Sequence, residues 1–84
     1  MRPYAIYINE AALASAPKSG SQRERVMDFI RSLADNPNTP GDFSETDGAG
    51  RKVQVKVIGR YALTYWADHP VLEIKVTHIK LADQ

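Results

Sequence analysis

The fold is decided by residues 51–80, which read RKVQVKVIGRYALTYWADHPVLEIKVTHIK. Residues 51–58 alternate polar and apolar side chains with a period of two, and their valines favour a strand. Residues 61–67 are rich in aromatic and β-branched side chains, and residues 71–79 alternate again. Gly59-Arg60 and Asp68-His69-Pro70, which separate these segments, are typical of turns. The pattern therefore predicts a meander of three antiparallel strands.

The register of this meander determines which side chains share a face of the sheet. Closure of the first hairpin about Gly59-Arg60 gives the pairs Val57–Ala62, Val55–Thr64 and Val53–Trp66. Closure of the second about His69 gives the pairs Trp66–Leu72, Thr64–Ile74 and Ala62–Val76. Both choices turn the valines and the tryptophan toward one buried face. The opposite, open face then carries Lys52, Gln54, Lys56, Tyr61, Leu63, Tyr65, Glu73, Lys75 and Thr77.

The first half of the chain predicts one strand and two helices. Residues 4–8 are strand-like, and Asn9 can cap a short Ala-rich helix over residues 10–16. A Ser-x-x-Glu capping box at residues 21–24 opens a second helix, which runs to about residue 35. Its apolar stripe is made of Val26, Phe29, Ile30 and Leu33. Residues 42–50 are polar and acidic, and we expect an exposed loop there that includes Phe43.

These elements predict a single α+β domain over residues 1–84, in the order β-α-α-β-β-β, with two helices packed on one face of an antiparallel sheet. The chain has no cysteine, which excludes disulfides and thiolate metal sites. Its two histidines lie apart and predict no metal site, and no motif calls for a cofactor. There is no run of about 20 apolar residues and no signal-peptide core, so we expect a cytoplasmic protein with no membrane partner.

Charge is distributed unevenly along the chain, although the formal net charge is only +1. Residues 51–80 carry six lysines or arginines against two acidic residues, whereas residues 41–50 carry three acidic residues and no basic one. A basic sheet face is either a site for an anionic partner or ordinary solvated surface, and the sequence leaves both interpretations open.

Two motifs resemble the RelE/ParE superfamily of bacterial type II toxins. Residues 59–65, Gly-Arg-Tyr-Ala-Leu-Thr-Tyr, are similar to the family's Gly-x-Tyr-Arg-Val-x-Tyr strand. Residues 33–37, Leu-Ala-Asp-Asn-Pro, are similar to the end of its second helix. The order of the predicted elements is also that of the family, so the resemblance covers nearly the whole chain and implies a RelE-like fold.

The resemblance implies a toxin held inactive by a cognate antitoxin protein. RelE-like members enter the ribosome and cleave mRNA without a metal or other cofactor, using the RNA's own 2′-hydroxyl as nucleophile. Basic side chains stabilise the added negative charge on the phosphate, and tyrosines stack bases. Carried over to this chain, the expected catalytic residues are Lys52, Lys56, Arg60 and Lys80. The expected substrate-binding residues are Lys75, Tyr61, Tyr65 and His78.

The chain departs from the family pattern in two places. Ala62 stands where the family has an arginine, and no tyrosine follows the last predicted strand. ParE-like members, which poison DNA gyrase, also lack the nuclease residues, so a gyrase inhibitor is one alternative. A relative without catalytic activity that only binds a partner protein is another. In each case Ile58, Leu63 and Phe43 are expected to be exposed contacts for the antitoxin.

Overall fold

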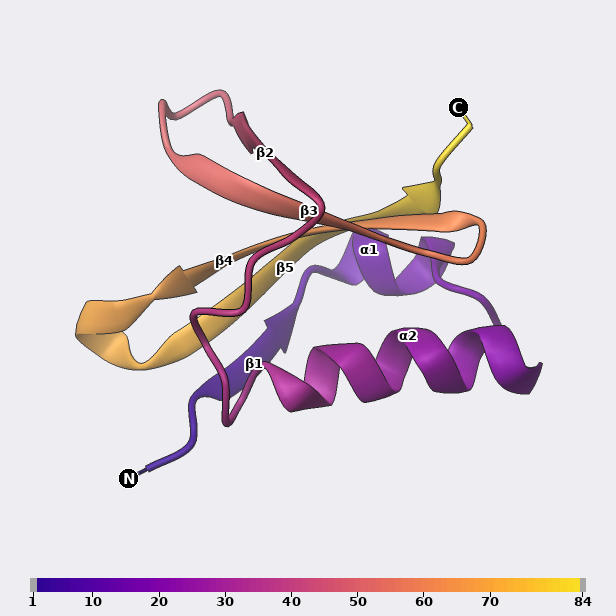
Figure 1. Cartoon of the computed structure of the whole chain (residues 1–84), viewed down its shortest axis with the longest axis horizontal. Coiled ribbons are helices and arrows are strands. Elements are labelled where there is room, and N and C mark those ends of the chain that lie inside the picture. Colours follow the sequence, from indigo (N-terminus) through magenta and orange to yellow (C-terminus); the bar gives the residue numbers. More distant parts are fainter. Residues whose placement is uncertain (1, 84) are drawn as a thin grey trace.

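Two helices cover one face of a twisted five-stranded sheet in the computed structural model, which describes residues 2–83 (Figure 1). The first strand is followed by both helices and then by four strands: β1 (Ala5–Ile8), α1 (Glu10–Ser15), α2 (Gly20–Ser32), β2 (Phe43–Thr46), β3 (Lys52–Ile58), β4 (Tyr61–Asp68) and β5 (Glu73–Leu81). A 3-10 turn, η1 (His69–Val71), connects β4 to β5. The strand order across the sheet is β1-β5-β4-β3-β2.

The α+β class is confirmed, and two details of the expected sheet are corrected. β1 pairs with β5 in parallel, so the sheet is mixed and not purely antiparallel. Residues 43–46, expected to lie in an exposed loop, form the edge strand β2 against β3. Segment 42–50 thus contains a hairpin, because Asp47 closes a tight connection by accepting hydrogen bonds from the backbone N–H groups of Ala49 and Arg51, each at 2.9 Å.

Both helices begin close to the predicted residues, but only the first is capped as expected. The side chain of Asn9 accepts hydrogen bonds from the N–H groups of Ala11 and Ala12 at 2.8 and 3.4 Å. The predicted capping box is wrong, because α2 already begins at Gly20 and Ser21 lies inside its first turn. The start of α2 is held instead by contacts to neighbouring segments, such as the hydrogen bond from Arg23 to the Pro17 carbonyl oxygen at 2.9 Å.

The register is confirmed in the first hairpin of the meander and wrong in the second. Val57 opposes Ala62 and Val55 opposes Thr64, as Gly59-Arg60 predicts. In the second hairpin the partners of these β4 strand positions are different: Ala62 pairs with Lys80, Thr64 with His78 and Trp66 with Lys75. The connection is longer than expected because η1 is followed by Leu72 in the left-handed conformation, with φ 56°. A β-bulge then leaves Thr77 as an extra residue in β5.

The expected sidedness of the sheet is also wrong. Leu63 and Tyr65, expected on the open face, are 0% and 2% exposed and belong to the core under the helices. They pack there with the α2 stripe and with Ile74, Val76 and Ile79 of β5. The bulge explains how β5 contributes all three: one extra residue changes the phase of the strand, so positions 74, 76 and 79 share a face. Together with Leu63 and Tyr65, these β5 side chains offer a larger apolar surface than Val53, Val55 and Trp66, which lie on the other face.

Val53 and Val55 are nevertheless buried, although no helix covers them. Their cross-strand neighbours in β2 are Glu45 and Phe43, and the β2–β3 hairpin rises from the sheet on the side away from the helices (Figure 1). The twist of a two-stranded ribbon is larger than that of a broad sheet. The uncovered face is therefore concave, with the β2–β3 hairpin as its wall.

Candidate functional site

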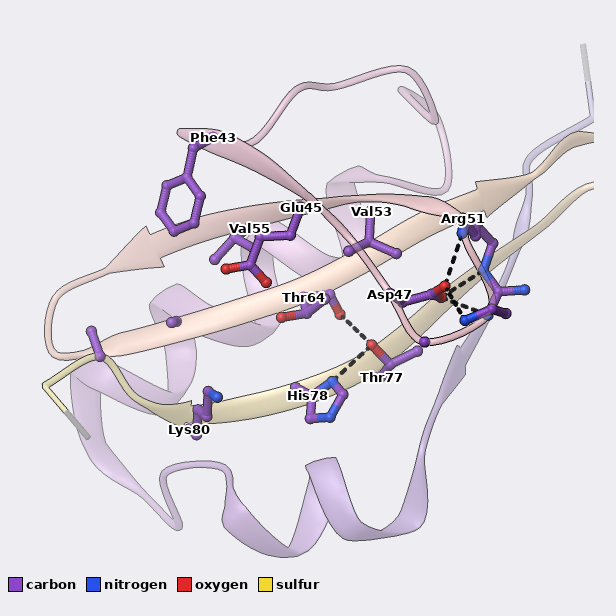
Figure 2. A pocket seen from close by; sticks show the side chains of 14 residues that line it. Phe43, Glu45, Asp47, Arg51, Val53, Val55, Thr64, Thr77, His78 and Lys80 are labelled. Atoms are coloured by element: carbon purple, nitrogen blue, oxygen red, sulfur yellow. Dashed lines mark hydrogen bonds and ion pairs between the residues drawn. The ribbon is translucent and has the colours of Figure 1, made fainter.

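A cavity of about 710 Å³ occupies this concave face, between the β2–β3 hairpin and strands β4 and β5 (Figure 2). Val53, Val55 and Ala62 make its lining partly apolar. Its ionisable side chains come from three separate segments of the chain: Glu45 from β2, Asp47 and Arg51 from the hairpin loop, and His78 and Lys80 from β5. The sheet therefore brings together groups that can bind an anion and groups that can transfer a proton.

His78 is oriented by the bulge that precedes it. Its Nδ1 lies 3.1 Å from the Thr77 hydroxyl, and that hydroxyl donates a hydrogen bond to the Thr64 carbonyl oxygen at 3.4 Å (Figure 2). A threonine hydroxyl has one proton to donate, so toward His78 it acts as an acceptor. In the tautomer that this arrangement fits, the imidazole proton is on Nδ1 and Nε2 has a free lone pair. Nε2 is therefore the atom of His78 that can accept a proton.

Arg51 is anchored at the other end of the cavity. Its Nε donates to Asp47 Oδ2 at 3.0 Å, and its guanidinium carbon lies 4.0 Å from the centre of the Trp66 ring. The hydrogen bond from the backbone N–H of Arg51 is the main reason why the pKa of Asp47 lies below its usual value. The backbone N–H of Ala49 and the side chain of Arg51 lower it further. Asp47 is thus ionised at neutral pH and holds the Arg51 guanidinium in place. Part of this guanidinium stays available to a ligand.

Two of the eight site residues predicted from the sequence, His78 and Lys80, line this cavity. Lys75 lies on the same face of the sheet, paired with Trp66, but its ammonium forms an ion pair with Glu73 at 2.9 Å. The hydrogen bond to Glu73 is the main reason why the pKa of Lys75 is raised. Lys75 also lies over the ring of Tyr7 and is therefore committed to neighbours outside the cavity.

The other predicted residues lie elsewhere. Lys56 is on the helix side of the sheet, where it pairs with Leu63 and its Nζ lies 3.5 Å from Asp42 and 5.9 Å from the centre of the Phe29 ring. The prediction that it shares a face with Lys75 is wrong, because the β4–β5 register differs from the expected one. Arg60 lies in the β3–β4 turn. Lys52 lines a separate, smaller cavity.

Neither expected tyrosine reaches the cavity. Tyr61 is half-buried and packs against the core, while Tyr65 is part of it and meets the ring of Phe29 edge-on. The Tyr65 hydroxyl donates a hydrogen bond to the Thr39 carbonyl oxygen at 3.1 Å, and burial raises the pKa of Tyr65 to about 12. Both side chains therefore contribute to packing, and Tyr65 is not available to stack on an RNA base.

Of the three residues expected to contact the antitoxin, two are buried and one is exposed. Ile58 and Leu63 are buried in the core, so the expectation that they are exposed is wrong. Phe43 is 50% exposed on the edge strand β2, beside the cavity. Only this residue of the three is available to a partner.

Sequence reasoning missed Glu45 and Arg51 as members of the site. Glu45 was assigned to a loop because residues 42–50 are polar and acidic. Residues 43–46, Phe-Ser-Glu-Thr, contain a single apolar side chain and do not alternate, so no period-two pattern marked this short edge strand in the sequence. Arg51 was treated as part of the general basic charge of the meander, and its contact with Trp66 depends on the three-dimensional twist of the hairpin.

Within residues 2–83, no group of three or more histidine, aspartate or glutamate side chains is arranged to hold a metal ion. None of the helices in this part of the chain is long and apolar enough to cross a membrane. No protein-family model matches the sequence, and no curated protein shows significant similarity to it. The resemblance to the RelE/ParE superfamily accordingly rests on the motifs at residues 33–37 and 59–65 and on the order of the elements.

Proposed function

We propose that the protein is the toxin of a type II toxin–antitoxin pair and that it cleaves mRNA on the ribosome at the cavity containing His78. The motifs shared with the RelE/ParE superfamily support the first part of this proposal. The second part is carried by one observation: an imidazole, an ammonium, a guanidinium and a carboxylate all line the same cavity. Such groups can transfer protons and stabilise the negative charge that develops in metal-independent RNA cleavage.

The chemistry assigned to the cavity is attack of the RNA 2′-hydroxyl on the adjacent phosphorus. The bond to the 5′-oxygen of the next nucleotide breaks, and a cyclic phosphate and a free 5′-hydroxyl result. The 2′-hydroxyl must lose a proton, and Nε2 of His78 is the basic atom that the hydrogen-bond network leaves available. Lys80 and Arg51 supply positive charge for the phosphoryl oxygens. The departing 5′-oxygen takes up a proton from solvent water, a transfer that Glu45, the second group of the cavity able to transfer a proton, can relay.

This assignment revises the catalytic residues that the resemblance implied. His78 and Lys80 are retained, whereas Lys52, Lys56, Arg60, Lys75, Tyr61 and Tyr65 lie outside this cavity. Ala62, in the position of the family's arginine, lies inside it beside Lys80, its cross-strand partner. Lys80 can therefore place a cation close to the position that the family arginine would occupy.

Controlled expression without the antitoxin tests the proposal. The wild-type protein should arrest growth, and mapping of RNA 5′ ends should reveal new cuts in translated mRNA. His78→Gln removes the base and should reduce cleavage by about 100-fold or more. Lys80→Gln should also reduce it, whereas Lys18→Gln, which makes the same charge change in the loop before α2, should not. Intact mRNA on ribosomes during arrest by the wild-type protein would contradict the proposal.

Inhibition of DNA gyrase is the second candidate, and the apolar part of the cavity favours it. Strand β3 contributes Val53 and Val55 to the same face as Ala62, so no cation from β3 points toward the position of the missing family arginine. An apolar concave face suits a protein partner better than a phosphate. Growth arrest with DNA breaks and intact mRNA would select this function. Normal growth with neither lesion would leave only the role of a partner-binding relative.

Both candidate functions require a cognate antitoxin. Phe43 on edge strand β2 is the exposed apolar residue next to the cavity, so an antitoxin bound there would also close the cavity. Co-purification with the product of an adjacent short, acidic reading frame tests this expectation, and Phe43→Ser should weaken the complex without unfolding the toxin.

A further inference from the structure

A second cavity, of about 370 Å³, lies between the loop of residues 37–40 and one end of strands β3 and β4. Two cationic side chains, those of Arg51 and Lys52, line it together with His69, and no aspartate or glutamate is among its lining residues. The first cavity, in contrast, is lined by both Glu45 and Asp47. The smaller cavity therefore has a positive local charge without an acidic group in its lining to neutralise it.

Two of these side chains can bind an additional anion. Within residues 2–83, the ammonium of Lys52 makes no hydrogen bond or ion pair. Arg51 is bound by Asp47 through Nε and Nη2, and Nη1 has no partner in the described part of the chain. A guanidinium held along one edge presents its other edge in a fixed direction, which favours a phosphate group.

His69 and Trp66, two further lining residues of this cavity, are also held by contacts. Tyr4 and His69 are joined by a hydrogen bond of 2.7 Å between the tyrosine hydroxyl and Nδ1, which holds the imidazole and leaves Nε2 unengaged by this contact. Trp66 is partly exposed, and its ring is contacted by the Arg51 guanidinium. The cavity thus combines cationic side chains with an aromatic ring, a combination that binds single-stranded nucleic acid.

Arg51 lines both cavities, so one side chain borders the two sites. A strand of RNA whose scissile phosphate lies beside His78 and that passes Arg51 would bring a neighbouring nucleotide to Lys52 and Trp66. We propose that the smaller cavity binds a phosphodiester group of the RNA strand, next to the nucleotide that is cleaved. This inference rests on the proposed RNA-cleaving function and adds a binding subsite to it.

Trp66 is the only tryptophan in the chain, so its fluorescence reports directly on this cavity. The probe is a hexamer of 2′-O-methyluridine, which lacks the nucleophile and cannot be cleaved. Titration of the wild-type protein should give a saturable change in Trp66 fluorescence. Lys52→Gln should weaken binding about tenfold, because it removes a hydrogen bond to a charged group. It should also make the dependence of log K on log salt concentration shallower by about 0.7, the value for one phosphate contact on a single strand.

Lys18→Gln is the matched control, because it removes the same charge from an exposed lysine that lines neither cavity. It should leave both the affinity and the salt dependence unchanged, and thermal unfolding should verify that both variants are folded. Equal affinity and equal salt dependence of Lys52→Gln and the wild type would overturn the inference. So would binding of the hexamer with no change in Trp66 fluorescence, or no binding at all. The proposed function is decided separately, by cut sites in cellular mRNA.

Discussion

The two faces of the sheet are both apolar at their centres, yet only one is covered by helices. On the covered face, Leu63 and Tyr65 pack with β5 side chains and the α2 stripe. On the other, Val53 and Val55 are shielded by their own hairpin and line a cavity. The difference teaches that alternation in a strand reveals an apolar row but does not say what covers it. The helices pack on the face with the larger total apolar surface, summed over all strands.

The bulge at Thr77 links the two faces. On the covered face it lets Ile79 join Ile74 and Val76 in the core. On the open face it places the Thr77 hydroxyl beside His78, an arrangement that fits the tautomer with the imidazole proton on Nδ1. One extra residue in β5 therefore completes the core and orients the site, which agrees with the frequent occurrence of bulges next to active sites.

Truncation of one central side chain on each face should give the largest difference between the faces in the free energy of unfolding that is lost. Leu63→Ala should lower the free energy of unfolding by about 2–5 kcal/mol, because it opens a void in a fully packed core. Val55→Ala should cost only about 1–2 kcal/mol, since fewer carbon atoms are lost and the side chain already borders a cavity. Chemical denaturation measures both values. Equal losses would mean that the open face is packed as tightly as the core.

Substitution of Gly41, in the segment that connects α2 to β2, should have the next largest effect on stability. A Cβ atom on Gly41 would lie 2.4 Å from the Val55 carbonyl oxygen, a contact that rigid backbone cannot accommodate. Gly41→Ala should therefore displace the start of β2 and destabilise the protein by about 1–3 kcal/mol. Gly48→Ala is the matched control, because its Cβ would meet nothing within 4 Å, and it should change stability by less than about 0.5 kcal/mol.

Sequence patterns were sufficient for the features that depend on neighbours along the chain. The helices, the Asn9 cap, the α2 stripe and the Gly59-Arg60 hairpin all follow from local spacing or turn chemistry. The register of the second hairpin could not be predicted, because it depends on the left-handed conformation of Leu72 and on the bulge at Thr77. Neither leucine nor threonine is a residue type that indicates such a conformation. The error propagated to the site. Reversed sidedness put Lys56 and Tyr65 on the open face and left Val53, Val55 and Trp66 in the predicted core.

Removal of the Tyr65 hydroxyl tests a smaller contribution to the covered face. Tyr65→Phe loses the hydrogen bond to the Thr39 carbonyl oxygen and should cost about 1 kcal/mol at neutral pH. Because the pKa of Tyr65 is raised to about 12, the native state retains this proton between pH 10 and 12, while the unfolded chain releases it. The stability of the wild type should therefore fall as pH rises through this range.

Tyr65→Phe should reduce that alkaline loss of stability, measured by denaturation at a series of pH values. Tyr61→Phe is the control, because the Tyr61 hydroxyl makes no hydrogen bond within residues 2–83, and the wild-type dependence should persist in it. If the two variants responded alike to alkaline pH, the buried Tyr65 hydroxyl would not be the group that titrates.

The smallest effect is expected at Asp42, where β2 is held against β3. Its Oδ2 accepts a hydrogen bond from the Val57 N–H at 2.8 Å, and its Oδ1 lies 3.5 Å from Lys56 Nζ. The Val57 N–H, and to a smaller extent Lys56, lower the pKa of Asp42. A lowered native pKa means that the unfolded chain binds the proton first as pH falls. The stability from this carboxylate is thus complete well above pH 3.8, the usual pKa of an aspartate, and is lost as pH falls through the native pKa.

Asp42→Asn should therefore flatten the decline of stability below about pH 4, because the amide cannot ionise. Asp35→Asn changes the same functional group where no hydrogen bond or ion pair involves the side chain in residues 2–83, so it should keep the wild-type acid dependence. Denaturation between pH 2 and 6 compares the three proteins. An acid dependence in Asp42→Asn as steep as that of the wild type would show that β2 is held by its backbone pairing alone. The wall of the cavity would then not depend on this carboxylate.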